Sequence, residues 1–210
     1  MLQELWFHFG GDEVDTRCWG PPPGTHPNIT GTYPWNERVW KWLQARNLSG
    51  IGSRDIHGFG PPVFLQQALG YFYQRVDQIA FAHGLTPVHW TEAFDTLGQQ
   101  LDKRAVIQVC PSKTVGMCGY STTTIGTVVA AGYRAIFNDY ANYYLGMSSG
   151  TVTWDRIYEV EPLAGIDDPE QQKLVVGAEI CKWVRTMLLF PRPACVALRL
   201  LTRGTGCRAR

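Results

Sequence analysis

Short apolar runs alternate with longer segments of helical period along most of this chain. The runs are rich in β-branched and aromatic residues, as buried strands are, and they cover residues 5–9, 87–90, 105–109, 134–137 and 174–178. Between the first two runs, apolar side chains recur at steps of three and four over residues 65–83, and Gly84 follows. This period predicts an amphipathic helix that ends at a glycine. Further helices are predicted over residues 34–48 and over residues 121–131, the latter closed by Gly132.

The order of strand, helix, strand, helix predicts a parallel sheet covered by helices, and two architectures share it. A doubly wound sheet is expected to carry a glycine-rich phosphate loop after its first strand, and this sequence has neither GxGxxG nor GxxxxGK[ST]. A TIM (β/α)8-type barrel fits better, because polar and acidic residues follow the strands, where barrel enzymes carry their chemistry. We therefore predict an α/β fold with an incomplete barrel, about strands 4 to 8 with their helices, as one unit over residues 1–210.

Composition narrows the classes of function. The 210 residues are 45% hydrophobic, which is enough to bury a substantial core. A formal net charge of +1 gives no electrostatic footprint for nucleic acid or for an anionic membrane, and no apolar run is long enough to span a bilayer. We expect neither as a partner. The six cysteines form no CxxC pair and no zinc spacing, and they leave the redox compartment open. We expect no metal and no cofactor.

The stretch LWFHFGGDEVD, residues 5–15, ends a predicted strand in two glycines, Asp12 and Glu13. Adjacent carboxylates oppose each other's ionisation, so one can keep a proton near neutral pH while the other stays charged. Such a pair suits acid catalysis, and a solvated acidic loop is the alternative.

Other strand ends carry acids and aromatic rings, namely Trp90, Glu92, Asp139, Tyr143, Tyr144, Glu179 and Trp183. Each ring taken alone is more often a core residue. Together at one barrel rim they would form an aromatic cup around carboxylates, which suits a sugar ring.

The segment HFGGDEVDTRCW, residues 8–19, resembles the H-x-G-G-D-E-V active-site motif of family 20 glycoside hydrolases, the β-N-acetylhexosaminidases. The likeness continues in chain order through VHWTEAFD, AVIQV, AGYRAIF, YEVEPL and VVGAEICKW to LFPRPACVALRLL. It therefore spans nearly the whole chain, and several motifs in the same order are far more specific than one.

The resemblance implies a retaining glycosidase that removes terminal, non-reducing β-linked N-acetylglucosamine or N-acetylgalactosamine. Glu13 would be the general acid, and Asp12 would orient the substrate's 2-acetamido group, whose oxygen attacks the anomeric carbon to give an oxazolinium ion. Tyr144 resembles the tyrosine that hydrogen-bonds the acetamido oxygen. Trp90 and Trp183 resemble the tryptophans that wall the acetamido pocket.

The resemblance also implies N-acetylhexosamine-containing glycans as ligands, assembly as a homodimer or heterodimer, and a lysosomal or secreted location. No signal peptide is visible in this chain, whereas two N-glycosylation sequons begin at Asn28 and Asn47. His8 resembles a supporting residue of the family motif, and a plain structural role is its alternative.

Departures from the family pattern leave two alternatives open. Only eleven residues precede Asp12, although family members carry earlier barrel strands with a sugar-binding arginine, and Cys110 and Arg185 stand near positions where the family tends to have tryptophan and glutamate. A truncated or inactive relative that at most binds glycans would fit these departures. A glycosidase that uses Glu92 or Glu179 as its second carboxylate is the other alternative.

Overall fold

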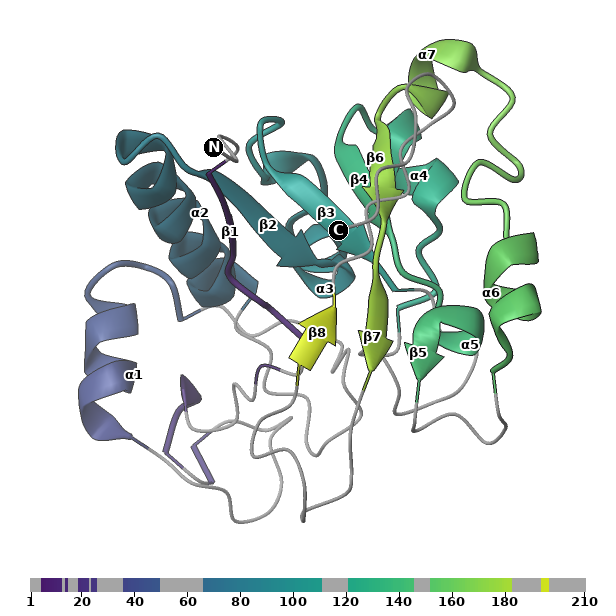
Figure 1. Cartoon of the computed structure of the whole chain (residues 1–210). Coiled ribbons are helices and arrows are strands. Elements are labelled where there is room, and N and C mark those ends of the chain that lie inside the picture. The colour runs from purple at the N-terminus through teal and green to yellow at the C-terminus, as the bar shows by residue number, and fades with distance from the viewer. Residues whose placement is uncertain are drawn as a thin grey trace.

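The protein is described from a computed structural model, which places residues 5–12, 14, 19–22, 24–25, 36–49, 66–110, 121–145, 152–182 and 194–196 (Figure 1). The helices of this part are α1 (Glu37–Gln44), α2 (Gln66–Ala82), α3 (Thr91–Leu97), a 3₁₀ turn (Gly98–Gln100), α4 (Ile125–Ala130), α5 (Tyr140–Tyr143), α6 (Trp154–Glu159) and α7 (Pro169–Gln172). The strands are β1 (Trp6–His8), β2 (Thr86–Trp90), β3 (Val106–Val109), β4 (Arg134–Phe137), β5 (Tyr144–Leu145), β6 (Val175–Ala178), β7 (Ile180–Lys182) and β8 (Ala194–Val196).

A five-stranded sheet in the order β1-β2-β3-β4-β6 forms the centre of the molecule, and every neighbouring pair in it is parallel. All the strands predicted from the sequence are members of this sheet, so the prediction of a helix-covered parallel sheet is confirmed. In the described part of the chain, β1 and β6 stand at the two ends of the order and each pairs with one strand. Strands β5, β7 and β8 form a separate, smaller sheet in the order β5-β7-β8, and β7 follows β6 in the chain.

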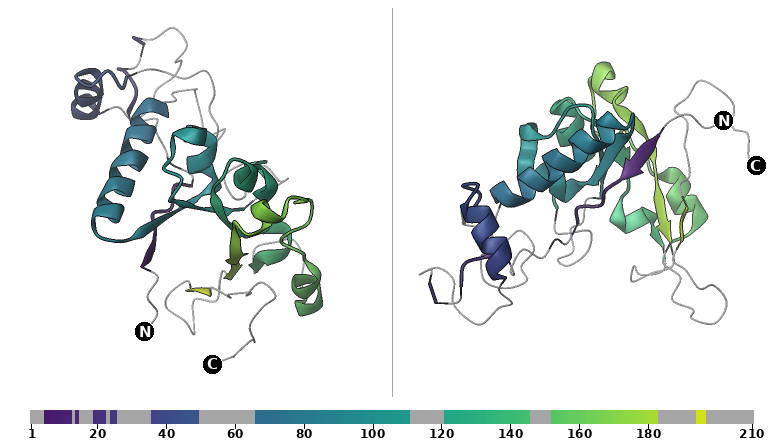
Figure 2. Two further views of the ribbon diagram at one scale, coloured as in Figure 1. Left: turned by 90° about the horizontal axis from the view of Figure 1, so that it is seen from above. Right: turned by 90° about the vertical axis from the view of Figure 1, so that its left-hand side faces the viewer.

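The hydrophobic core lies between one face of the large sheet and helices α2, α3 and α4 (Figure 2). Side chains alternate between the two faces of a strand, so Ile107 and Val109 of β3 enter this core, together with Leu69 of α2 and Val128 of α4. Gln108, between Ile107 and Val109, faces the opposite side of the sheet. Trp90 is opposite Gln108 in the register and therefore shares that face.

The predicted helices form, with ends fixed by local chemistry. Helix α2 ends before Gly84, which has a φ of 69°, so the predicted glycine stop is confirmed. Helix α4 is shorter than its predicted range because Thr124 caps it, its Oγ1 accepting a hydrogen bond from the Thr127 N–H. Helix α1 begins after Asn36, whose side chain accepts from the Val39 N–H.

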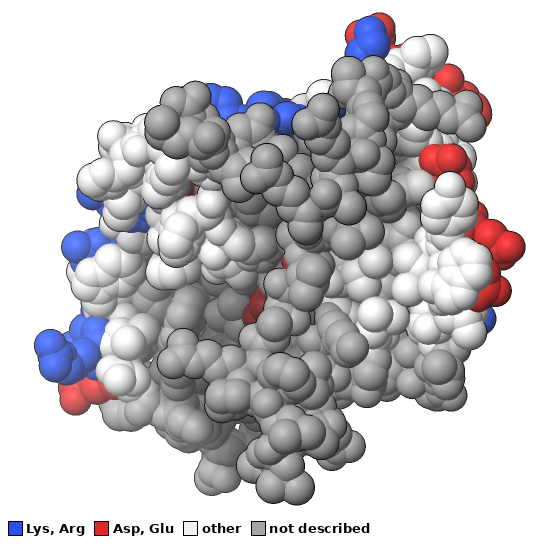
Figure 3. All heavy atoms as spheres, viewed as in Figure 1, with Lys and Arg blue, Asp and Glu red and all other residues white. Residues whose placement is uncertain are grey.

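Among the described residues visible in Figure 3, Lys and Arg lie at the left and top edges of this face, and most of the Asp and Glu lie at its right edge. Within the described ranges, every helix is too short or too polar to serve as a membrane span.

Candidate active site

The loop after β1 carries Asp12, and its backbone is held by several hydrogen bonds. Gly10 and Gly11 have φ angles of 72° and 109°, a region that glycine enters without steric cost. The Gly10 N–H donates to His8 Nδ1 over 2.9 Å, and the Gly10 carbonyl accepts from the Trp90 N–H over 3.0 Å. The second of these bonds ties the loop to the carboxyl end of β2. Asp12 lies two residues after Gly10 in the same loop.

The second glycine is in close contact with helix α2. The Tyr73 hydroxyl donates to the Gly11 carbonyl over 2.9 Å. A Cβ atom added at Gly11 would lie 2.8 Å from the Tyr73 hydroxyl oxygen, so any larger residue here would displace one of the two. Glycine is therefore required at position 11 both for its backbone angle and for the space that Tyr73 occupies.

The structure brings Trp90 and the Asp12 loop together. Trp90 is the last residue of β2, half-buried, and its ring centroid lies 5.0 Å from that of His8. Desolvation lowers the pKa of His8, and Gln108 partly offsets this effect. A neutral His8 agrees with its role as acceptor for the Gly10 N–H. Glu13 and Trp183 lie outside the described residues.

Tyr144 lies after β4, on the short strand β5, where it is half-buried and packs 4.7 Å from Tyr140 between ring centroids. It pairs in register with Cys181 of β7. Its neighbour Tyr143 is fully buried and packs edge-on against Phe137, so Tyr143 is a core residue rather than part of a rim. Asp139 caps α5 by accepting from the Ala141 N–H.

The two further acids also follow strands of the large sheet. Glu92, in the first turn of α3, is 3% exposed. Burial raises the pKa of Glu179, which follows β6 and whose N–H donates to the Phe137 carbonyl. In the part of the chain that the structure describes, no three His, Cys, Asp or Glu residues are grouped to hold a metal ion.

Several buried polar residues near these strand ends were not singled out from the sequence. Gln108, on the same face as Trp90, is 1% exposed, and its side chain influences the pKa of both His8 and Glu179. His89 and Asp77 form a buried pair on the opposite face, beside Tyr73. Polar residues that interrupt apolar runs, as in VHW and VIQV, are the sequence signal that could have indicated them.

The chain belongs to glycosyl hydrolase family 20, because the profile of that family's catalytic domain matches residues 1–200. It is 34% identical over 207 residues to beta-hexosaminidase 1 of Arabidopsis thaliana, an alignment that covers 92% of this chain and 30% of the relative. It is 29% identical to beta-hexosaminidase subunit alpha of Bos taurus, covering 95% of this chain and 33% of that one. The chain thus spans about a third of the length of these relatives.

Solved structures show the same fold. A Flavobacterium johnsoniae chitobiase superposes with a TM-score of 0.53 at 19% identity, over 85% of this chain and 22% of that one. A β-N-acetylhexosaminidase from Bacteroides fragilis gives 0.52 at 15% identity, over 86% and 31%.

Proposed function

We propose that the protein is a β-N-acetylhexosaminidase that hydrolyses terminal, non-reducing β-linked N-acetylglucosamine or N-acetylgalactosamine residues. Family membership and the beta-hexosaminidase relatives support the class of reaction. The observation that carries the proposal is the loop after β1, whose two left-handed glycines and hydrogen bonds to Trp90 and Tyr73 hold Asp12 at the carboxyl ends of parallel strands. Chemistry in α/β enzymes of this kind is concentrated at that edge.

The proposed mechanism is retaining and substrate-assisted. Asp12 orients the 2-acetamido group, whose carbonyl oxygen attacks the anomeric carbon as Glu13 protonates the departing glycosidic oxygen. Asp12 also stabilises the positive charge that forms on the acetamido nitrogen. Glu13 then removes a proton from the water that opens the oxazolinium ion. Trp90 and Trp183 wall the acetamido group, and Tyr144 donates to its oxygen.

The proposed architecture is a TIM (β/α)8-type barrel of which residues 1–210 form one partial catalytic domain. The parallel order β1-β2-β3-β4-β6 and the likeness to family 20 structures support it. In a barrel, the face that carries Trp90 and Gln108 would be the interior. Relatives named as alpha and beta subunits motivate the further proposal of a homodimer or heterodimer.

We propose a lysosomal or secreted location. Asn47, which begins the sequon Asn47-Leu48-Ser49, is exposed in the turn after α1 with a φ of 53°, so its side chain is accessible to a glycosyltransferase. Cys110 is disulfide-bonded, which fits an oxidising compartment.

Substitution of Glu13 by Gln tests the proposed activity. Purified protein should release 4-nitrophenol from 4-nitrophenyl N-acetyl-β-glucosaminide, and Glu13→Gln should lower kcat by about 10² to 10⁴, the usual contribution of a general acid. The matched control is Glu37→Gln, because Glu37 is an exposed residue of α1 that pairs with Lys41. Unchanged turnover in Glu13→Gln would refute the assignment.

A second substrate tests the mechanism. The corresponding β-glucoside has a hydroxyl in place of the acetamido group, so the proposed mechanism predicts no turnover of it. Cleavage of the β-glucoside would instead support an enzyme that uses Glu92 or Glu179 as second carboxylate. A folded protein that cleaves neither substrate would be an inactive relative.

A further inference from the structure

The peptide that joins Gly11 to Asp12 is held by a side chain from a distant part of the chain. The Tyr73 hydroxyl, on α2, donates to the Gly11 carbonyl over 2.9 Å, and Tyr73 is 1% exposed. Because the carbonyl carbon of Gly11 is bonded to the nitrogen of Asp12, this hydrogen bond fixes the orientation of the peptide plane that leads into the acidic pair. The other hydrogen bonds described for the loop act on Gly10, one residue earlier.

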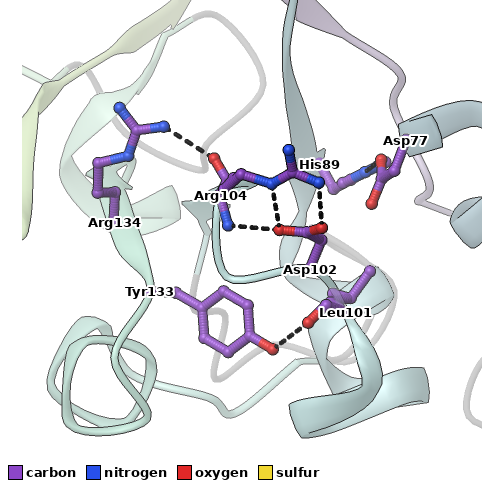
Figure 4. A network of polar contacts seen from close by, with 7 residues as sticks. All are labelled: Asp77, His89, Leu101, Asp102, Arg104, Tyr133 and Arg134. Carbon is purple, nitrogen blue, oxygen red and sulfur yellow. Dashed lines mark hydrogen bonds and ion pairs between the residues drawn. The ribbon is translucent and has the colours of Figure 1, made fainter. Parts of the chain in front are cut away.

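A buried polar pair, His89 and Asp77, packs behind Tyr73. His89 Nε2 and Asp77 Oδ1 are hydrogen-bonded over 2.7 Å, and the two residues are 0% and 3% exposed (Figure 4). The His89 ring packs edge-on against Tyr73, with centroids 5.4 Å apart, and stacks on Phe9 of the β1 loop at 5.9 Å. Asp77 lies one helical turn after Tyr73 on α2, so both side chains lie on the helix face toward β2.

The pair is costly to bury, which indicates a role beyond packing. Asp77 Oδ2 and His89 Nδ1 have no hydrogen-bond partner within the described residues. Buried ionisable pairs are generally less stabilising than well-packed apolar residues of similar volume. A pair with two unsatisfied atoms at this place therefore points to a need for fixed side-chain geometry.

We propose that Tyr73 is a positioning residue for the catalytic loop, and that the Asp77–His89 pair holds Tyr73 against Gly11. The inference rests on the proposed function, in which Asp12 and Glu13 perform the chemistry. Burial, together with the negative charges of Glu92 and Asp12, raises the pKa of Tyr73, so its hydroxyl remains a donor at working pH. A misplacement of reacting groups by about 1 Å can cost about a hundredfold in rate.

The first test removes the Tyr73 hydroxyl and keeps its ring. Tyr73→Phe should lower kcat on the N-acetyl-β-glucosaminide by about tenfold to a hundredfold while KM changes less than about threefold, because Tyr73 positions the acids and does not touch the sugar. A kcat within about twofold of the unsubstituted protein would overturn the proposal.

Tyr133→Phe is the matched control. Tyr133 is also fully buried, and its hydroxyl also donates to two backbone carbonyls, that of Leu101 at 2.9 Å (Figure 4) and that of Gly98 at 3.1 Å. Gly98 and Leu101 precede β3 in the chain, and Tyr133 directly precedes β4, so these bonds lie at the amino ends of the parallel strands. The acidic loop lies at the carboxyl ends. Tyr133→Phe should therefore lower stability as Tyr73→Phe does but leave kcat unchanged. An equal loss of kcat in the two variants would show a general structural effect and overturn the proposal.

Asp77→Asn tests the contribution of the buried pair. It keeps the side-chain shape and replaces the carboxyl group that faces His89 by a neutral amide, which forms a weaker hydrogen bond than a carboxylate does. We expect kcat to fall by about threefold to tenfold, and the double variant with Tyr73→Phe to fall no further than Tyr73→Phe alone, because both changes act through one contact. Additive losses would overturn the role of the pair. If Tyr73→Phe yields no folded protein, Asp77→Asn carries the test, and an unchanged kcat would overturn the proposal.

Hydrogen exchange separates this inference from the proposed function. Amides in the segment of Gly10, Gly11 and Asp12 should exchange at least about tenfold faster in Tyr73→Phe and at the same rate in Tyr133→Phe. An inactive unsubstituted protein would refute the proposed function but leave this measurement decisive. Equal exchange in all three proteins would overturn the positioning role of Tyr73.

Discussion

At the scale of single residues, the placement of Asp12 depends on a few contacts to the backbone of two glycines. His8 accepts the Gly10 N–H through Nδ1, which requires an unprotonated nitrogen. Tyr73 requires the absence of a side chain at Gly11, where a Cβ would come within 2.8 Å of its hydroxyl oxygen. The glycines are thus needed for more than a tight turn, since each carries a specific hydrogen bond that a displaced backbone would lose.

Acidification should weaken the contact between His8 and Gly10. The pKa of folded His8 lies below the unfolded value of 6.5, mainly through desolvation, so the unfolded chain binds the proton more tightly. The stability contributed by neutral His8 is therefore present above about pH 6.5 and is lost as the pH falls through the lowered pKa. We expect the Tm to fall between about pH 7 and about pH 5, and His8→Asn to reduce this fall.

The His8→Asn variant is informative because an asparagine oxygen can accept the same N–H two residues on without titrating. His83→Asn, at an exposed position after α2, is the control. Thermal unfolding followed by circular dichroism at several pH values would measure the difference. Identical pH dependence in His8→Asn and the unsubstituted protein would contradict a role for His8 titration.

The sequence predicted part of the candidate site at this scale. The acidic pair and Trp90 were predicted because they follow recognisable strands, and the structure places Trp90 beside the Asp12 loop. Tyr73, Asp77 and His89 were not predicted, because their roles depend on the contact between α2 and β2. A tyrosine in an amphipathic helix has the same sequence pattern whether its hydroxyl is buried or solvated.

At the scale of elements, the strands of the large sheet were predicted from the sequence, whereas the short helices α3 and α7 were not. The five strands β1, β2, β3, β4 and β6 are apolar runs bounded by turn signals, so their identity was evident. Helix α3 was missed because it begins at the residue after β2, with Trp90 as both the strand end and the helix cap. Helix α7 had a readable signal, since Asp168 caps it and Pro169 is its first residue.

Helix α4 gives a prediction about element stability. It has six residues, and its N-terminus is held by Thr124 Oγ1, which accepts from the Thr127 N–H, while Val128 and Val129 are buried against the sheet. Thr124→Ala should lower the free energy of unfolding by about 1 kcal/mol, the usual value of an N-cap. The Tm should fall by about 2–4 °C for a domain of this size.

Thr124→Ser is the matched control, because serine caps helices as well as threonine does. Urea unfolding of the three proteins would give the differences in free energy. Equal stability of the alanine and serine variants would mean that the Thr124 hydroxyl does not contribute, and that packing of Val128 and Val129 alone holds the helix.

At the scale of the whole molecule, β1 forms one edge of the large sheet as far as the described residues show. In the described residues β1 pairs only with β2, and apolar side chains are exposed along it, with Phe7 within the strand 52% and Leu5 just before it 59% exposed. The relatives are about three times as long as this chain, which covers 30% to 33% of them. A barrel would pair this edge with a further strand, so the edge is the place where the 210-residue chain is expected to associate.

Residues 1–210, expressed alone, should therefore self-associate through β1. Phe7→Lys should increase the fraction of monomer, because a charge on an edge strand opposes pairing with another chain. Size-exclusion chromatography with light scattering over a range of concentrations would measure this. Tyr158→Lys is the control. Tyr158 is 84% exposed on α6, away from the sheet edge, and its substitution removes a comparable area of exposed apolar surface. Equal gains from both variants would indicate general hydrophobic aggregation, and a chain that is monomeric without substitution would contradict association at β1. A gain confined to Phe7→Lys would locate the contact at the β1 edge of the sheet, because only this variant places a charge on that edge.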